Sequence, residues 1–460
     1  MHSITGLNWG IFEILFIILA GGIGFIITYL IMPIIITHMK KKGHVGIDIH
    51  KNAKPEVAES GGLGMVLGWV IALIFLLPFF PIFLNEIIVI ILTILLATLI
   101  GYIDDRIKLR SRYKILLTIL IGLFIFIANY FDYINIRDPI LPILGQLRLT
   151  LIFPILIPII ITIFANTVNM LEGYNGEGSG TCLIAVGFLI ICSIIWNSAE
   201  GLLLTIITFP IILAFFFFNK YPAKTFPGDV GTLTMGVMIA SIALFGGLLA
   251  AVFCVLLQHI CNSFYYISSV GGFFESEEIH QFRGDIILLK NDKIKASENK
   301  DALLTLPRLI LSKGPLKEIE LVKNFYGLSL FCGSLAIITT LLKKLTVGSL
   351  DIIFIISILV ISFIPIVISL YYLKRIIDMA IQIILLYLML IIILIFIDFL
   401  IIPNFPGSIN LIIINIPLNI ILSLLITVPG LIAWWILTIN YFWKQIAKQN
   451  ELKNMKSGIK

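Results

Sequence analysis

The sequence has 460 residues, of which 59% are hydrophobic and only 13% are charged. A soluble globular chain is usually about half apolar and about a quarter charged, so this composition excludes that class of protein. The net charge of +6 is informative mainly through where the basic residues lie.

Long apolar runs recur along the whole chain and predict an all-α polytopic membrane protein with about 13 transmembrane helices. The first run has no basic residue before it, which favours a retained helix over a cleaved signal peptide. The last run contains Pro417 and Pro429, so we expect it to kink or break. The predicted spans are 10–36, 61–81, 86–103, 113–131, 149–166, 181–197, 201–219, 230–246, 248–272, 325–342, 350–373, 378–402 and 410–443.

The basic residues indicate an orientation with the N-terminus outside. All but four of the 32 Lys and Arg residues then lie on the inner side, as the positive-inside rule requires. For Lys40–Lys42 and the tail 444–460, orientation and attraction to anionic lipid headgroups explain the charge. The exceptions outside are Arg137, Arg148, Lys343 and Lys344. The inner linkers are 37–60, 104–112, 167–180, 220–229 and 273–324.

The first inner linker, Gly46–Gly62, holds acids, lysines and a glycine pair where a helix is expected to start. A helix N-terminus favours anions, so this linker could bind a phosphate group. A solvated connector explains the same residues equally well.

The second inner linker begins with Asp104 and Asp105, directly after an apolar span. Adjacent carboxylates at a membrane boundary repel one another unless a cation or a proton relieves them. Ionisable groups in such positions are functional by default. Five basic residues follow within the nine positions of Arg106–Lys114, which suits a phosphorylated ligand. We therefore favour a functional role here.

The third inner linker, Asn166–Gly180, combines asparagines, two acids and four glycines between two apolar runs. Glycines let the backbone approach a bulky anionic ligand closely. Asparagine and carboxylate oxygens are ligands that Mg²⁺ accepts. Alone, the segment could be a simple turn, but the other linkers on the same face favour a ligand site.

The fourth inner linker, Asn219–Asp229, ends in a Gly-Asp pair that opens a helix. Asp229 could cap that helix or hold a catalytic metal ion, and the sequence leaves both roles open. Phe226 could stack on an aromatic base or simply pack.

The fifth inner linker, 273–324, is the only extramembrane segment of any size. Its stretch Asp285–Ser297 predicts a β-hairpin around Lys290–Lys293. His280 and Arg283 lie just before this hairpin, and a lone histidine is more often structural than catalytic.

Together, the inner face holds carboxylates, clustered bases, glycine-rich loops and an aromatic residue, which is the inventory of metal-assisted phosphoryl transfer. The sequence has no Walker loop, Ser-His-Asp set or zinc motif. Its five cysteines fall inside apolar runs, which indicates packing.

These motifs resemble those of the polyprenyl-phosphate N-acetylhexosamine-1-phosphate transferases, and in particular the dolichyl-phosphate (UDP-N-acetylglucosamine) GlcNAc-1-phosphotransferases of eukaryotes and archaea. The likeness covers about residues 10–342. It rests on Gly46–Ser60, Asp104–Lys114, Asn166–Gly176, Tyr221–Asp229 and the hairpin loop, in family order.

The resemblance implies transfer of GlcNAc-1-phosphate from UDP-GlcNAc to a membrane polyprenyl (dolichyl) phosphate, with release of UMP. This would be the first step of lipid-linked oligosaccharide synthesis for N-glycosylation, with Mg²⁺, or Mn²⁺ in its place, as cofactor. It implies a ten-helix transferase core over 1–345, with the cytosolic loop 273–324, and leaves 346–460 as extra helices and a basic tail without a counterpart. The expected partners are these substrates and membrane lipids, not nucleic acid, and a homodimer is left open. We expect a cytosolic active site in a prokaryotic cell membrane of archaeal type, favoured over endoplasmic reticulum.

The resemblance also assigns residues. The magnesium ligands fall on Asn169 and Asp229, the diphosphate-binding lysine on Lys114, and the catalytic aspartate pair on Asp104 and Asp105. Uridine contacts would come from Ile49, Gly173, Asn175 and Phe226, while Glu59 would lie near the sugar and orient an arginine of the last inner linker. The remaining substrate-binding candidates are Asp48, Lys51, Asn166, Asn219, His280 and Arg283.

Two departures bear on the sugar. Dolichol-type enzymes carry Arg-His-Arg before the hairpin, whereas this chain has His280-Gln-Phe-Arg283, so one basic contact is missing or supplied from elsewhere. Bacterial cell-wall enzymes of the family typically have Asp-Gly-x-Asp-Gly and a histidine-rich last loop, whereas this chain has Glu172–Gly176 and no histidine cluster. The lack of both bacterial features favours GlcNAc over another UDP-N-acetylhexosamine used for cell-wall or surface glycans.

A transporter of lipid or nucleotide sugar is the alternative from another class. Transporters tend to bind at mid-bilayer on broken helices, often with repeat symmetry. This chain has its polar residues at one face and no recognised internal repeat. An inactive scaffold is disfavoured by the intact Asp104–Asp105 pair and Gly228–Asp229.

Overall fold

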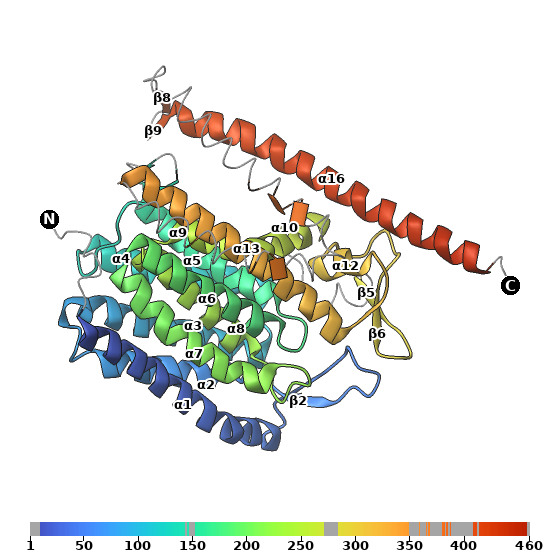
Figure 1. Ribbon diagram of the computed structural model, residues 1–460, viewed down its shortest axis with the longest axis horizontal. Helices are drawn as coiled ribbons and strands as arrows, with labels where there is room; N and C mark the ends of the chain where they lie inside the picture. Colours follow the sequence, from blue (N-terminus) through green and yellow to red (C-terminus); the bar gives the residue numbers. More distant parts are fainter. Residues whose placement is uncertain are drawn as a thin grey trace.

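The computed structural model describes residues 10–142, 145–146, 152–270, 284–348, 408–411 and 414–457, with isolated positions between 358 and 387. Within these residues, eight helices are long and apolar enough to cross a membrane, or nine if one bent pair counts as a span. The protein is therefore an all-α integral membrane protein (Figure 1). The eight are α1 (Ile11–Lys41), α3 (Leu84–Ile107), α4 (Ser111–Tyr130), α5 (Ile152–Leu171), α6 (Glu177–Trp196), α7 (Ala199–Asn219), α8 (Gly228–Phe245) and α13 (Glu318–Val347).

Two of the predicted spans in the core differ in form from the structure. The span predicted at 61–81 is a shorter helix, α2 (Gly62–Leu76), followed by the 3-10 turn η1 (Pro81–Phe83). The span at 248–272 is broken into α9 (Leu249–Val255) and α10 (Leu257–Val270), which are bent by 65°.

The run predicted as one last span at 410–443 begins as a strand pair, β8 (Ser408–Leu411) and β9 (Ile414–Pro417). It continues as one helix, α16 (Leu418–Ser457), with Pro429 inside it. The predicted spans 350–373 and 378–402 lie outside the described residues, apart from isolated positions. The count of about 13 spans stays a prediction.

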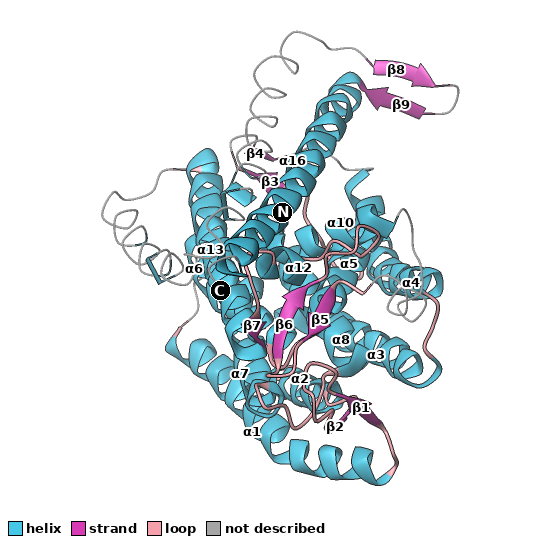
Figure 2. Cartoon of the chain, turned by 90° about the vertical axis from the view of Figure 1, so that its right-hand side faces the viewer, coloured by secondary structure: helices cyan, strands magenta, loops and turns pink. Residues whose placement is uncertain are grey.

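Small antiparallel sheets shape the loops. The predicted hairpin is present as β5 (Ile286–Leu288) and β6 (Lys293–Ala296), and β7 (Leu316–Lys317) adds a third strand after α12 (Leu306–Leu311). The first inner linker also forms a hairpin, β1 (Val45–Ile47) with β2 (Glu56–Ala58), which the residue pattern did not predict. A further pair is β3 (Ile140–Leu141) with β4 (Gly145–Gln146). The β1–β2 and β5–β6–β7 sheets gather at the end of the bundle that faces the viewer in Figure 2.

Helix α8 lies in the middle of the bundle: 83% of the residues in its apolar stretch are buried, against 28% of those in the apolar stretch of α1. Its neighbours approach it through positions without side chains. A Cβ at Gly62 would lie 2.2 Å from the Cα of Gly231, one at Gly101 would lie 2.6 Å from the Cα of Val230, and one at Gly236 would lie 2.5 Å from the Cα of Ala165. Close contacts with α2, α3 and α5 therefore fix the position of α8, those with α2 and α3 at its first turn.

Candidate functional site

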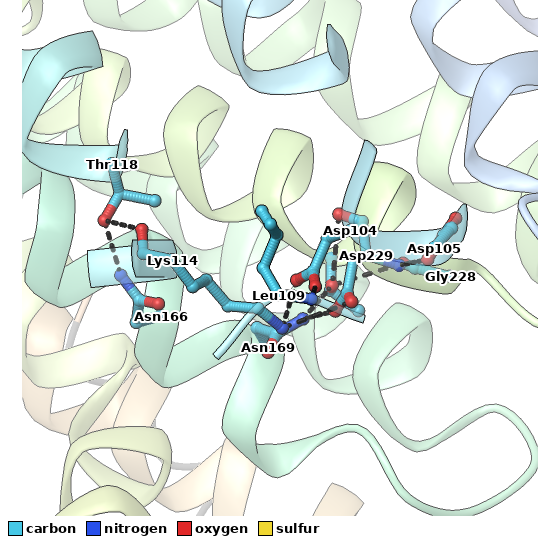
Figure 3. A network of polar contacts seen from close by, with 10 residues as sticks. Asp104, Asp105, Leu109, Lys114, Thr118, Asn166, Asn169, Gly228 and Asp229 are labelled. Atoms are coloured by element: carbon cyan, nitrogen blue, oxygen red, sulfur yellow. Dashed lines mark hydrogen bonds and ion pairs between the residues drawn. The ribbon is translucent and has the colours of Figure 1, made fainter. Parts of the chain in front are cut away.

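Four helix ends meet at one place, which we call the site end of the bundle. Asp104 and Asp105 lie in the last turn of α3, Lys114 in the first turn of α4, Asn169 in the last turn of α5 and Asp229 in the first turn of α8. Figure 3 shows the side chains of Asp104, Lys114, Asn169 and Asp229 pointing toward one another. Residues far apart in the sequence thus come together because each directly borders an apolar span.

Lys114 is the centre of this cluster. Its ammonium group forms an ion pair with Asp104 and lies 3.2 Å from Oδ2 of Asp229. Asn169 donates from Nδ2 to Oδ1 of Asp229 and, at 2.7 Å, to the hydroxyl of Thr232. Asp229 does not cap its own helix, since its carboxylate is turned to Lys114 and Asn169.

Asp105 points away from Lys114. One of its carboxylate oxygens accepts from the backbone N–H of Asp229 at 2.6 Å, and the other accepts from the hydroxyl of Ser60 at 2.6 Å. A carboxylate at a helix N-terminus is stabilised by the free N–H groups there. Asp105 thus anchors α8, while Asp104 faces the cluster, although the two residues are adjacent in the chain.

Gly228 makes this anchoring possible. It has a φ of +66°, and a Cβ there would lie 2.4 Å from Oδ2 of Asp105. The turn into α8 therefore requires glycine, because a side chain would collide with the carboxylate and strain the backbone.

The donor set of the cluster suits a hard divalent cation. Two carboxylates, from Asp104 and Asp229, face the ammonium group of Lys114, and that of Asp105 lies directly behind Asp229. A rotated Asn169 amide would present its oxygen in place of its nitrogen, because the two are assigned from the hydrogen-bond network. Oxygen ligands of this kind fit Mg²⁺ or Mn²⁺.

A second polar cluster surrounds Asn175. Its amide nitrogen donates to Asp48 at 2.9 Å and to Glu318, and its amide oxygen accepts from the backbone N–H of Ala223 at 3.2 Å. Asn175 is 3% exposed, so its side chain is engaged in joining neighbouring loops. In this conformation it holds the site end together.

The ammonium group of Lys51 offsets part of the negative charge of the two acids in this second cluster. Its ammonium group pairs with Asp48 and lies 3.8 Å from Glu318. Burial alone would raise the pKa of Asp48, but hydrogen bonds from Asn175 and Lys51 outweigh it and lower that pKa below its ordinary value. Asp48, His50 and Glu318 have potential metal-ligand atoms within 4.8 Å of one another. Only two carboxylates meet here, whereas the first cluster has a third one, that of Asp105, beside Asp229, so we do not assign a metal ion to this second cluster.

Hydrogen bonds to Glu177 and from Tyr326 fix the conformation of the third inner linker. Glu177 accepts from the backbone N–H groups of Gly173 and Tyr174, at 3.0 and 3.1 Å, and the hydroxyl of Tyr326 donates to the carbonyl of Gly176 at 2.6 Å. Gly173 is left exposed at the surface of the loop. An exposed glycine on a fixed loop allows a ligand to approach the backbone closely.

The other predicted residues lie in different places. Ile49 is 58% exposed and directly follows Asp48 of the second cluster, and Phe226 lies next to Gly46. Glu59 is half-buried, and burial raises its pKa, which the charges of Arg106 and Lys108 only partly offset.

Asn166 and Asn219 make hydrogen bonds within the protein, and their role in substrate binding stays a prediction. Asn166 donates to Thr118 and to the carbonyl of Thr162, both at 2.9 Å. Asn219 is fully buried, accepts from Ser179 at 2.6 Å and donates to the carbonyl of Thr225 at 3.0 Å. His280 and Arg283 lie outside the described residues.

The sequence pattern assigned no individual role to Glu318, Ser60 or Glu177, which the structure places at the site end. Glu318 was expected in a linker because its span was predicted to start at 325, whereas α13 begins at Glu318. The signal that could have located it is the pair Gly314-Pro315, a break in the chain after which a new element is plausible.

A separate cavity of about 420 Å³ lies at the opposite end of the bundle, lined in part by Glu86, Glu200 and Lys343. Helix α3 carries Glu86 in its first turn and Asp104 in its last, which the helical rise separates by roughly 27 Å. This cavity is therefore no part of the site described above.

Comparison with known proteins gives matches over the same region. The family model described as glycosyl transferase family 4 matches residues 87–247, which include Asp104, Lys114, Asn169 and Asp229. A Sulfolobus acidocaldarius protein described as a putative UDP-N-acetylglucosamine–dolichyl-phosphate N-acetylglucosaminephosphotransferase is 30% identical over 336 residues, which cover 71% of this chain and 97% of that protein.

Two further relatives extend this picture. A Saccharolobus solfataricus protein of the same description is 28% identical over 344 residues, covering 71% of this chain and 97% of the relative. A phospho-N-acetylmuramoyl-pentapeptide-transferase of Streptococcus pneumoniae is 28% identical over 238 residues, covering 49% of this chain and 72% of the relative. The archaeal relatives match over nearly their whole length, so part of this chain has no counterpart in them.

Proposed function

Because this chain belongs to glycosyl transferase family 4 and is a polyprenyl-phosphate sugar-1-phosphate transferase, we propose that it transfers GlcNAc-1-phosphate from UDP-GlcNAc to a polyprenyl or dolichyl phosphate. The reaction would release UMP and begin a lipid-linked oligosaccharide for N-glycosylation. The observation that carries the proposal is the cluster of Asp104, Lys114, Asn169 and Asp229 at the ends of four helices.

In this proposal an oxygen of the acceptor phosphate attacks the sugar-linked phosphorus of UDP-GlcNAc. A new P–O bond forms, the phosphoanhydride bond breaks, and UMP leaves with the bonding electron pair. The acceptor is a phosphate monoester and is already ionised near neutral pH, so the step needs little help from a general base. Lys114 would place its positive charge beside the diphosphate, and Asp104 would hold Lys114 in position.

The proposed cofactor is Mg²⁺ or Mn²⁺, held by Asp229, Asn169 and Asp104. When bound, the ion would supply positive charge that offsets the charge on the diphosphate. The gathering of carboxylates around Lys114 supports this assignment. Asp105, turned to α8 and Ser60, would keep the Asp229 ligand in place.

We place the site end in the cytosol, because most basic residues gather at that side of the predicted topology. The archaeal relatives favour the cell membrane of a prokaryote. The nucleoside would lie toward Ile49, Gly173 and Phe226, beside the rigid third linker.

The test incubates the purified full chain with a polyprenyl phosphate and a panel of UDP-sugars, and measures both UMP and lipid-linked product. We expect product from UDP-GlcNAc, loss of product with a chelator, and recovery with Mg²⁺ or Mn²⁺. If only a different UDP-N-acetylhexosamine gives product, that sugar replaces GlcNAc in the proposed reaction. Movement of UDP-sugar into vesicles without any lipid-linked product would overturn the proposal in favour of a transporter.

A further inference from the structure

Helix α16, which belongs to the part of the chain beyond the transferase core, packs against the core through aromatic residues. The ring of Trp434 stacks on Tyr265 of α10, with ring centroids 5.2 Å apart, and lies 5.5 Å from the ring of Phe264. Trp434 is 6% exposed and Phe442 only 1% exposed. At these two positions α16 is therefore packed as tightly as the core itself.

Arg308 of α12 joins α16 to the loop that carries the β5–β6 hairpin. Its guanidinium donates hydrogen bonds to the carbonyl oxygens of Ser297, Asn299, Ala302 and Leu303, at distances from 2.6 to 3.1 Å. The same group lies 4.5 Å from the centre of the Phe442 ring and 5.9 Å from that of Trp443.

A buried guanidinium is stable only when its donors and its charge are satisfied. Here the loop carbonyls satisfy the donors of Arg308, and the rings of α16 face its charge, an arrangement that is favourable when water is excluded. Nearer the end of α16, Gln449 donates to the carbonyl of Ser312, at the end of α12. Helix α16 thus contacts the loop at Phe442 and Trp443 and again at Gln449, about two turns further along the helix.

The hairpin in turn contacts the first inner linker. The backbone N–H of Asn52 donates to the carboxylate of Asp292 at 2.8 Å, and its side-chain amide donates to the carbonyl of Leu289 at 3.0 Å. Asn52 directly follows Lys51, the residue that balances Asp48 and Glu318 beside Asn175. A continuous series of contacts therefore leads from Phe442 to the second polar cluster.

We propose that α16 acts as an intramolecular clamp: by packing Phe442 and Trp443 on Arg308, it holds the β5–β6 hairpin against the first inner linker and so positions that linker for the nucleotide sugar. Phe442, Trp443 and Arg308 are positioning residues, since they act on the substrate only through the hairpin and the linker. The clamp's effect on catalysis rests on the proposed function, whereas its effect on the loop does not.

The experiment compares the full-length wild type with F442A/W443A in detergent. Amide hydrogen exchange over residues 285–313 should become faster by about ten-fold, because the loop loses its packed partner. KM for UDP-GlcNAc should rise by about five-fold while kcat changes less than about two-fold, since positioning is lost and the reacting groups are intact. The conservative variant W443F, which keeps an aromatic ring facing Arg308 at a half-buried position, should retain the wild-type values.

The matched control is L437A on the same helix, whose side chain is 62% exposed, and it should change neither measurement. If the double variant fails to fold, W443A, which removes a half-buried ring, must accelerate the same amides. Unchanged hydrogen exchange over 285–313 in F442A/W443A would overturn the clamp. A fall in kcat with an unchanged KM would also overturn it. Absence of transfer with every UDP-sugar would overturn the proposed function instead, and the exchange measurement would still decide the clamp.

Discussion

At the scale of single residues, the structure gives different positions to two carboxylates that the sequence sets side by side. Asp104 faces Lys114, whereas Asp105 accepts from Ser60 and from the backbone of Asp229. The sequence indicated that an Asp pair at a membrane boundary is functional, but a motif does not show which way each side chain points. That division depends on the helical phase of α3 and on where α8 begins.

This division predicts different outcomes for the two Asp→Asn substitutions. D104N should lower turnover by about 100-fold or more, because it removes the charge that faces Lys114. D105N should keep turnover within about ten-fold, because an amide oxygen can still accept from the N–H of Asp229. The rate of UMP release at saturating substrate measures the turnover of both variants. Equal losses of turnover in the two variants, with unchanged thermal stability, would contradict the assignment.

A second residue-scale prediction concerns Glu172. Burial raises the pKa of its carboxyl to about 8, against the opposing hydrogen bond from the N–H of Gly178. The folded protein therefore keeps a proton that the unfolded chain releases near its ordinary pKa of 4.5. This group thus lowers stability progressively as the pH rises from that value to about 8.

E172Q should remove this dependence, because the amide oxygen can still accept from Gly178 but carries no titrating proton. Melting temperatures in detergent should be similar for variant and wild type near the low end of that window, and higher for the variant near its upper end. A difference in melting temperature that stays constant with pH would show that Glu172 acts only through packing.

At the scale of elements, apolar runs located the core helices well but could not give their ends or breaks. The bend between α9 and α10 has neither Pro nor Gly in the chain around Leu256, so no local signal marks it. β1, β2 and β7 are two or three residues long and form through tertiary contacts, which a pattern of residues does not reveal. The β5–β6 hairpin, with strands of three and four residues, was predicted because its turn is rich in charged and polar residues.

The start of α8 gives the prediction at this scale. G228A should lower the free energy of unfolding by about 1–3 kcal/mol, because it forces a positive φ on alanine and brings Cβ to Asp105. Helix α1 offers a matched control, since a Cβ at Gly22 would meet nothing within 4 Å. G22A should be neutral or slightly stabilising. Thermal unfolding in detergent compares the two, and equal melting temperatures would argue against a strained turn.

At the scale of the whole molecule, the segregation of motifs onto one face was the part of the site that the sequence predicted most directly. Each of Asp104, Lys114, Asn169 and Asp229 borders an apolar span on the same predicted side, and the structure brings them together at one end of the bundle. Glu318 was missed because its helix begins earlier than its apolar run suggests. His280 and Arg283 stay predictions, since they lie outside the described residues.

Sidedness is a prediction of the charge pattern and can be measured. The native cysteines are all buried, so cysteines introduced at exposed positions should dominate labelling in sealed vesicles. A membrane-impermeant maleimide added outside right-side-out vesicles should label N135C but not K42C, because the two positions lie at opposite ends of the bundle. Labelling of K42C alone would reverse the proposed orientation.

The glycine contacts of α8 have a consequence for inhibitors. Because Gly62, Gly101 and Gly236 bring neighbouring backbones against it, the floor beneath Asp229 has little freedom to adjust to a bulky compound. Ile49 and Gly173, by contrast, are exposed on the loops above. Under the proposed function, a compound series aimed at this protein should therefore keep its phosphate-mimicking end constant and vary the end that meets those loops.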